Sequence, residues 1–231
     1  MMQDIEYNGI LASNMKLLVS EEISLPSAKP KYEEYDIAGR DGALTEENGT
    51  YEDVVIKIPF NYVEGREWGA AYRRAKKWLN EKGNNQLRLG RMSDNFYIVK
   101  RIEIGNDERK IENAGGFTAS FTCDPYTYFD SGLIQIEEKE IYNPYEISHP
   151  TYLITGNGTC TLTVNGKTMT ATVGQNLTID TNLMLAYRVD GTMMNTSVVG
   201  DYEDLYLLPG DNDISITAGF DLKVIPNWRC L

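Results

Sequence analysis

The chain has 231 residues, of which 42% are hydrophobic, 24% charged and 10% aromatic, a composition typical of one large globular domain or two smaller ones. It carries 34 acidic and 22 basic side chains, for a net charge of −12, which argues against a protein that grips DNA by its phosphates. Its apolar runs fall far short of the roughly 20 residues of a membrane helix. The N-terminal residues also lack the basic and apolar regions of a secretion signal, so no membrane or secretory role is expected.

The first 60 residues predict short strands separated by turns. Pro26 and Pro30 bracket a polar, extended stretch, which predicts a loop or arm. Residues 39–42, with the sequence Gly-Arg-Asp-Gly, predict a tight turn because glycine accepts a positive φ. Residues 54–60 alternate between apolar and polar side chains and predict a strand with one buried face.

Residues 66–82 are predicted to form an amphipathic helix. Apolar side chains recur there in one stripe with a period near 3.6, and Gly83 is expected just beyond the last turn. The helix should therefore pack on a sheet. Its other face is basic, and two interpretations remain open: a solvated surface, or a docking face for an acidic neighbour or subunit. The apolar stripe consists of Trp68, Ala71, Tyr72, Ala75, Trp78 and Leu79, and the basic residues are Arg66, Arg73, Arg74, Lys76, Lys77 and Lys82.

Strands follow the helix and complete a predicted N-terminal domain. Residues 86–89 and 96–104 are expected to form a hairpin, and residues 116–122 alternate as a strand that should end at Asp124-Pro125. We therefore expect residues 1–130 to form a mainly β, sandwich-like domain of α+β character with one helix. Residues 131–149, which are charged and contain a proline, are predicted to be a linker.

From residue 150 to residue 231 the pattern is almost entirely β. Short strands are expected at a spacing of roughly 8–12 residues, which is typical of a β-sandwich. Residues 164–167, with Asn-Gly at the centre, predict a two-residue hairpin turn. A hairpin is also expected at residues 156–158, and a strand at residues 205–207.

The sequence contains few of the residue patterns that catalysis, metal binding or cofactor binding requires. A single histidine, His149, excludes a site with several histidine ligands, and no phosphate-binding or dinucleotide-binding glycine motif is present. Cys123, Cys160 and Cys230 form no CxxC pair and are expected to be reduced and mostly buried. Residues 211–213 look like part of a calcium loop but lack its glycine and glutamate. We therefore predict no enzyme, with no catalytic, cofactor-binding or metal-binding residues and no cofactor.

The order of these features resembles the distal tail protein family of siphophages, the hub component of the phage tail tip. The resemblance spans nearly the whole chain and rests on the order of motifs that are weak singly. The motifs are Tyr7-Asn8-Gly9, the turn Gly39–Gly42 followed by the strand Val54–Ile58 and the helix that ends Trp78-Leu79, the strand Phe117–Thr122 that runs into Cys123–Tyr128, the segment Leu207–Ile214, and Pro226–Arg229.

This resemblance implies a virion protein at the tail tip, assembled in the cytoplasm of the bacterial host. It implies a homo-hexameric ring of N-terminal domains, with C-terminal β-sandwiches similar to galectin-like and carbohydrate-binding-module folds. The ring would join the tail tube to the hub or lysin protein, carry receptor-binding proteins at its rim, and let DNA pass its lumen without specific binding. An acidic surface suits such a channel because it repels DNA.

Two further hypotheses concern surfaces. We expect residues 1–130 to carry assembly, through the basic helix against an acidic strand surface and through residues 20–35 as an arm that reaches a neighbour. The alternative function is a carbohydrate-binding adhesion module that contacts the host cell wall through exposed aromatic side chains of residues 150–231, although the short loops there leave little room for a groove. Trp228-Arg229 is either an interface anchor or part of the sandwich core.

Overall fold

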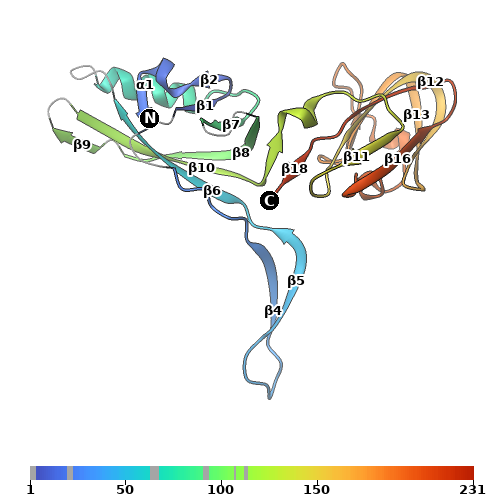
Figure 1. The fold of residues 1–231 in the computed structure, drawn as a ribbon, viewed down its shortest axis with the longest axis horizontal. Coiled ribbons are helices and arrows are strands. Elements are labelled where there is room, and N and C mark those ends of the chain that lie inside the picture. Colours follow the sequence, from blue (N-terminus) through green and yellow to red (C-terminus); the bar gives the residue numbers. More distant parts are fainter. Residues whose placement is uncertain (1–3, 20–22, 63–67, 91–93, 107, 112–113) are drawn as a thin grey trace. The chain divides into compact units, whose positions relative to one another are not determined.

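A computed structural model of the chain describes residues 4–19, 23–62, 68–90, 94–106, 108–111 and 114–231. The chain divides into two compact units (Figure 1). The first comprises Met1–Thr127 together with Leu231, and the second comprises Tyr128–Cys230. The protein is mainly β, as the sequence predicts.

Unit one is built on an antiparallel sheet whose strands follow the order β2-β1-β7-β8-β10-β6-β3, with β9 paired to β10. Its elements are β1 Ile5–Tyr7, β2 Ile10–Leu11, the 3₁₀ turn Ala12–Met15, β3 Leu17–Val19, β4 Pro30–Tyr35, β5 Leu44–Tyr51, β6 Val54–Tyr62, α1 Trp68–Leu79, β7 Gln86–Leu89, β8 Asn95–Ile104, β9 Glu108–Ile111 and β10 Ala114–Phe129.

The alternation predicted for residues 54–60 is confirmed. Along β6 every second side chain is buried, and β6 pairs with β10 from Asn61↔Gly116 to Val54↔Cys123. Strand β10 does not end at Asp124-Pro125 as expected but continues to Phe129. Its pairing with β6 stops at Cys123, so the missing N–H of Pro125 removes no hydrogen bond from that ladder.

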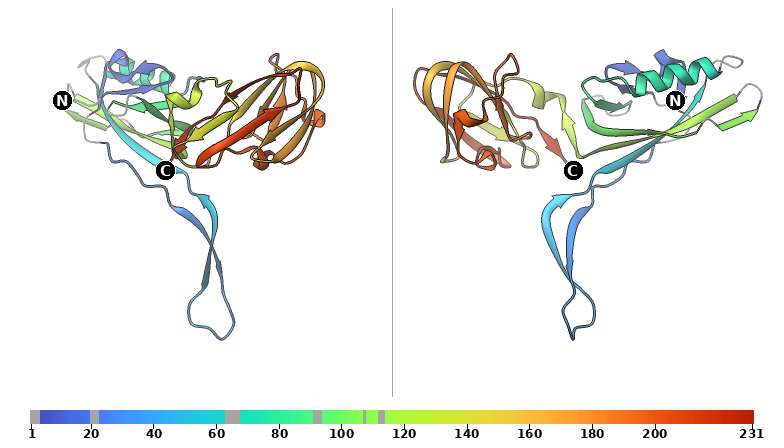
Figure 2. Two further views of the ribbon diagram at one scale, coloured as in Figure 1. Left: turned by 45° about the vertical axis from the view of Figure 1, so that its right-hand side comes forward. Right: turned by 180° about the vertical axis from the view of Figure 1, so that it is seen from behind.

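Helix α1 lies on one face of this sheet (Figure 2). Trp78 is 2% exposed, and its indole Nε1–H donates to the carbonyl of Tyr7 at 3.1 Å. The ring of Tyr7 packs edge-on against Trp78 and Phe121. The helix thus joins the sheet through aromatic contacts, each worth about 0.5–1.5 kcal/mol beyond the area it buries.

The helix ends at Leu79, three residues before the predicted end at Lys82, while Arg66 and Glu67 lie outside the described residues. The side chain of Asn8 explains the early end. Its Nδ2 donates to the carbonyl of Glu81 at 2.9 Å, and its Oδ1 accepts from the N–H of Asn85 at 2.8 Å. A Cβ on Gly83 would lie only 2.5 Å from this side chain, so the chain leaves the helix to pass beside Asn8 and enter β7.

Unit two is a second antiparallel sheet that follows the order β11-β16-β12-β13-β14, with β15 on β13 and β17 on β12. Its elements are the 3₁₀ turn Asp130–Leu133, β11 Glu140–Asn143, β12 Thr151–Val164, β13 Lys167–Asp180, β14 Leu185–Tyr187, the 3₁₀ turn Asn195–Ser197, β15 Val198–Val199, the 3₁₀ turn Tyr202–Leu205, β16 Gly210–Ile216, β17 Asp221–Ile225 and β18 Arg229–Cys230.

One long hairpin, β12 with β13, organises this unit. The turn at 165–166 is the predicted Asn-Gly turn, with a positive φ at both residues. The hairpin expected at residues 156–158 is wrong: β12 runs through them in register, from Gly156↔Gln175 to Gly158↔Val173. Glycine at 158, with φ +113°, lets the strand bend instead of turn. The first half of β12 then pairs with β17 and its second half with β16.

Two other expectations differ from the structure. Residues 131–149, expected as a linker, contain β11, which pairs with β16, so this segment forms part of unit two. The strand expected at 205–207 is instead the end of a 3₁₀ turn followed by an isolated bridge from Leu207 to Ser148. Ser148 is fully buried and exchanges two backbone hydrogen bonds with Leu207, which outweighs any local strand preference.

Candidate assembly surfaces

The basic face of α1 is exposed. The described helix carries Arg73, Arg74, Lys76 and Lys77 and no carboxylate. All four side chains are exposed, and the Lys76 ammonium lies 5.3 Å from the centroid of the Tyr72 ring. Within the part of the chain that the structure describes, no carboxylate forms a salt bridge with Arg73, Lys76 or Lys77. Four cations in five positions repel one another, so this face favours an anionic partner.

Strands β4 and β5 form a hairpin, here called the arm (residues 30–51), which is exposed along nearly its whole length (Figure 1). The hydrogen-bonded turn at its end spans residues 37–40, where the N–H of Arg40 donates to the carbonyl of Ile37 at 3.1 Å, so the turn lies two residues before the predicted 39–42. Gly39 at φ +83° and Gly42 at φ +76° supply the positive φ values of this loop. The sequence predicts an extended arm but not its second strand, because residues 44–51 are polar and do not alternate. An isolated two-stranded hairpin is marginally stable in water.

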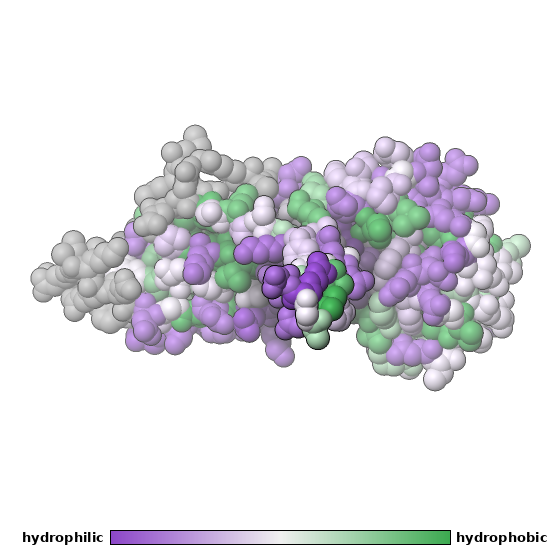
Figure 3. Space-filling view, turned by 90° about the horizontal axis from the view of Figure 1, so that it is seen from below, coloured by the Kyte–Doolittle hydropathy of each residue, from purple (hydrophilic) through white to green (hydrophobic). Residues whose placement is uncertain are grey.

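The arm is acidic and also carries apolar side chains. Tyr32 is 56% exposed, Ile37 46% and Leu44 43%, and hydrophilic and hydrophobic residues lie side by side on the arm where it is seen end-on (Figure 3). Residues 30–51 hold six carboxylates against two basic side chains. The carboxylates belong to Glu33, Glu34, Asp36, Asp41, Glu46 and Glu47.

The register of the arm places like charges opposite each other. Glu33 pairs with Glu46 across the two strands, and the next pair on the same face is Tyr35 with Leu44. The Tyr35 hydroxyl donates to the Glu33 carboxylate, and this hydrogen bond raises the pKa of Tyr35. Directly opposed like charges destabilise a β-pair, so the arm is not optimised as an isolated element.

The base of the arm is held to the sheet. Lys100 on β8 lies 2.7 Å from a carboxylate oxygen of Asp53 and 2.8 Å from one of Asp124. Desolvation by itself lowers the pKa of Lys100, but the hydrogen bonds to Asp124 and Asp53 outweigh it, so the pKa lies above the usual value. The ring of Tyr51 also meets Tyr126 edge-on at 6.0 Å. These contacts anchor the arm while leaving its length uncovered.

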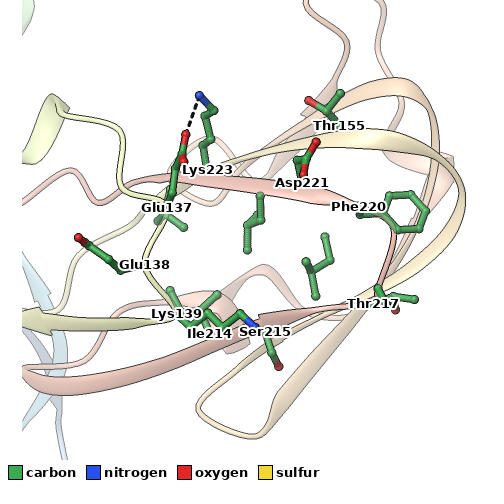
Figure 4. A pocket seen from close by; sticks show the side chains of 14 residues that line it. Glu137, Glu138, Lys139, Thr155, Ile214, Ser215, Thr217, Phe220, Asp221 and Lys223 are labelled. Atoms are coloured by element: carbon green, nitrogen blue, oxygen red, sulfur yellow. Dashed lines mark ion pairs between the residues drawn. The ribbon is translucent and has the colours of Figure 1, made fainter.

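Unit two contains a pocket of about 550 Å³ between β16, β17 and residues 137–139 (Figure 4). Its lining mixes apolar side chains such as Ile214 with charged ones, and two of the charged ones, Glu137 and Lys223, form an ion pair at 2.9 Å. Phe220 is the aromatic residue of the lining, and its ring packs against the backbone of Gly156, where a Cβ would come within 2.3 Å of it. The pocket is larger than the short loops suggested, but this ring is engaged with the strand rather than offered as a stacking platform.

The loop before β16 is held by Asn212, a residue that in the sequence looks only like part of an incomplete calcium loop. The side chain is 1% exposed. Its Nδ2 donates to the carbonyls of Leu208 and Gly210 at 2.8 and 2.9 Å, and its Oδ1 accepts from the N–H of Leu208 and from Asn165 Nδ2 at 2.9 and 2.8 Å. The side chain of Asn212 therefore holds the loop together through hydrogen bonds. The sequence feature that could have indicated this role is the Pro-Gly-x-Asn spacing.

The side chains singled out from the sequence for possible chemistry or contacts take part in packing within their own unit. Cys123 is fully buried, and burial raises the pKa of its thiol to about 12. His149 stacks on Tyr206 at 4.0 Å and lies beside Arg229, whose Nη2 is 2.9 Å from its Nε2. Trp228 is 6% exposed, so it belongs to the core of unit two.

Among the described residues there is no cluster of three or more histidine, cysteine or acidic side chains with the geometry to hold a metal ion. In the same residues, no helix has the length and apolar character needed to cross a bilayer.

The chain was compared with known proteins in sequence and in fold. No family model matches the chain, and no curated protein matches it in sequence. Four chains of solved structures match in fold. One of them is described as "Crystal Structure of SPP1 Dit (gp 19.1) Protein, a Paradigm of Hub Adsorption Apparatus in Gram-positive Infecting Phages"; it has a TM-score of 0.68 and 13% identity, and the match covers 100% of both chains. From end to end, this chain therefore has the fold of the SPP1 Dit protein.

Proposed function

We propose that this chain is a structural protein of a phage tail, a distal tail protein that forms part of the hub adsorption apparatus at the tail tip. The observation that carries the proposal is the shared fold with SPP1 Dit, a protein of that apparatus, over the full length of both chains. Fold alone does not specify function, but two further features support a role in assembly. They are the exposed acidic arm and the exposed basic helix of unit one.

In this proposal the chain forms a hexameric ring that joins the tail tube to the hub or lysin protein, with receptor-binding proteins as further partners. Closed rings need an interface between two different surfaces of each subunit, and unit one offers two surfaces of opposite charge. DNA passes the lumen without specific binding, which the net charge of −12 favours. The protein acts in the virion after assembly in the bacterial host, as a scaffold with no reaction of its own.

The proposal is tested on the purified full-length chain by mass photometry and negative-stain electron microscopy over a range of concentrations. We expect six-fold rings that grow in number with concentration. Gold-labelled antibody against the chain should mark the tail tip of particles. A chain that stays monomeric at every concentration, together with particles whose tail tips carry no label, contradicts the proposal.

A further inference from the structure

We infer that the arm of one copy docks on the basic face of α1 of a second copy, with Glu33 and Glu46 set against Arg73 and Lys77. This inference rests on the proposed function, because it names the contact by which the ring closes. The partner is a second copy of this chain, and the contact is electrostatic with an apolar margin supplied by Tyr35 and Leu44.

The two surfaces have complementary charge, and within the residues that the structure describes Arg73 and Lys77 form no salt bridge with a carboxylate. The arm bears six carboxylates against two basic side chains, and the described helix bears four basic side chains and no carboxylate. Both sets of side chains are exposed, so neither covers the other within one chain. A cationic partner relieves the repulsion between Glu33 and Glu46, and an anionic partner relieves the crowding of cations on α1.

The spacing of the charges also matches. Opposed residues of an antiparallel pair have Cβ atoms roughly 4.5–5.5 Å apart, which applies to Glu33 and Glu46. Residues four apart on a helix have Cβ atoms roughly 5–6 Å apart, which applies to Arg73 and Lys77. Two carboxylates can therefore meet two cations at the same time, with the guanidinium free to bind its carboxylate in bidentate geometry.

The opposite face of the arm provides a matched comparison. Glu34 and Glu47 lie on that face, because they flank the pair Glu33–Glu46 by one residue on each strand and successive side chains of a strand point to opposite faces. Reversing these two charges changes the net charge by the same amount as reversing Glu33 and Glu46. Only the latter pair belongs to the inferred contact.

The experiment uses charge exchange in the full-length chain, with association followed by mass photometry and folding checked by circular dichroism. The arm variant is E33K/E46K and the helix variant is R73E/K77E. Like charges placed opposite each other across an interface repel, so each variant alone should associate at least about tenfold more weakly than the parent. The control E34K/E47K should change association less than about threefold.

Two combinations make the test specific. The fourfold variant, with both pairs reversed, should regain association. An equimolar mixture of the arm variant and the helix variant should also assemble, because the arm of each then faces the helix of the other with opposite charge. Recovery in the mixture requires contact between copies, so it excludes an arm that folds back on its own helix.

A crosslink provides a readout that does not depend on altered affinity. Glu33→Cys with Lys77→Cys in one chain should give disulfide-linked multimers under mild oxidation, whereas Glu34→Cys with Lys77→Cys should give few. Association of the parent should weaken as salt approaches roughly 1 M, where the Debye length is about 3 Å.

The outcomes separate this inference from the proposed function. If the parent forms rings and E33K/E46K and R73E/K77E form them equally well, the arm–helix contact is wrong and the ring proposal stands. If E33K/E46K and R73E/K77E each fail to associate, and neither the fourfold variant nor the mixture regains association, the two surfaces do not meet each other. A parent that is monomeric at every concentration overturns the contact and the ring together.

Discussion

Replacing Asn212 by alanine should strongly destabilise unit two. The side chain makes four close hydrogen bonds from an almost fully buried position. Alanine leaves the carbonyls of Leu208 and Gly210 and the N–H of Leu208 without their partner. Each hydrogen bond contributes about 1 kcal/mol net, and buried groups left unpaired cost about 1–3 kcal/mol. Because water can reach part of this loop, we expect a total loss of about 3 kcal/mol.

The measurement is differential scanning calorimetry with a urea titration. For a unit of about 100 residues, 1 kcal/mol lowers Tm by roughly 4–8 °C, so Asn212→Ala should lower the transition of unit two by roughly 12–24 °C. Asn157→Ala is the matched control, because Asn157 is exposed in β12, and its Tm should shift by no more than about 3 °C. A Tm for Asn212→Ala as close to the parent as that of the control refutes the reasoning.

Asn212→Asp extends the same argument to pH. The aspartate keeps the shape of the side chain but replaces both N–H donors by an oxygen that faces two carbonyls. The charged form is therefore disfavoured in the folded state, and its folded pKa should exceed the unfolded value of about 3.9. The variant should be nearest to the parent in stability below that value and should lose stability as pH rises toward neutrality.

Three further predictions concern the arm and its surroundings. Trypsin should cut the free chain after Arg40 in the exposed turn of the arm, and assembly should slow this cleavage at least about tenfold; equal rates in both states count against an arm-mediated contact. Lys100→Met should lower the free energy of unfolding by about 1 kcal/mol at neutral pH, measured by urea titration, because it leaves Asp53 and Asp124 without their cation. This difference should disappear as pH rises through the raised pKa of Lys100, and a difference that does not change with pH argues against the ion pairs. The thiol of Cys123 should stay unmodified by a thiol reagent at pH 8 until the chain unfolds, because its pKa is near 12; modification of the native protein at the rate of the unfolded one contradicts its burial.

Local patterns in the sequence determined several elements of this protein. The alternation of residues 54–60, the apolar stripe of α1 and the Asn-Gly turn at 165–166 all express periods or φ values that nearby residues impose by themselves. The aromatic stripe also indicated that α1 packs on a sheet. The contrast between a basic helix and an otherwise acidic chain was visible in the positions of the charged residues along the sequence. These features survive because tertiary contacts reinforce the local preference.

Other features depended on contacts between residues far apart in the chain. The end of α1 at Leu79 depends on Asn8, about 70 residues earlier, and the in-register passage of β12 through residues 156–158 depends on its pairing with β13. The second strand of the arm has no apolar alternation, so only its pairing with β4 reveals it. The opposition of Glu33 and Glu46 follows from that register alone. Composition therefore determined the charges of this protein, and tertiary structure decided which of them face each other, because strand register joins residues that sequence spacing keeps apart.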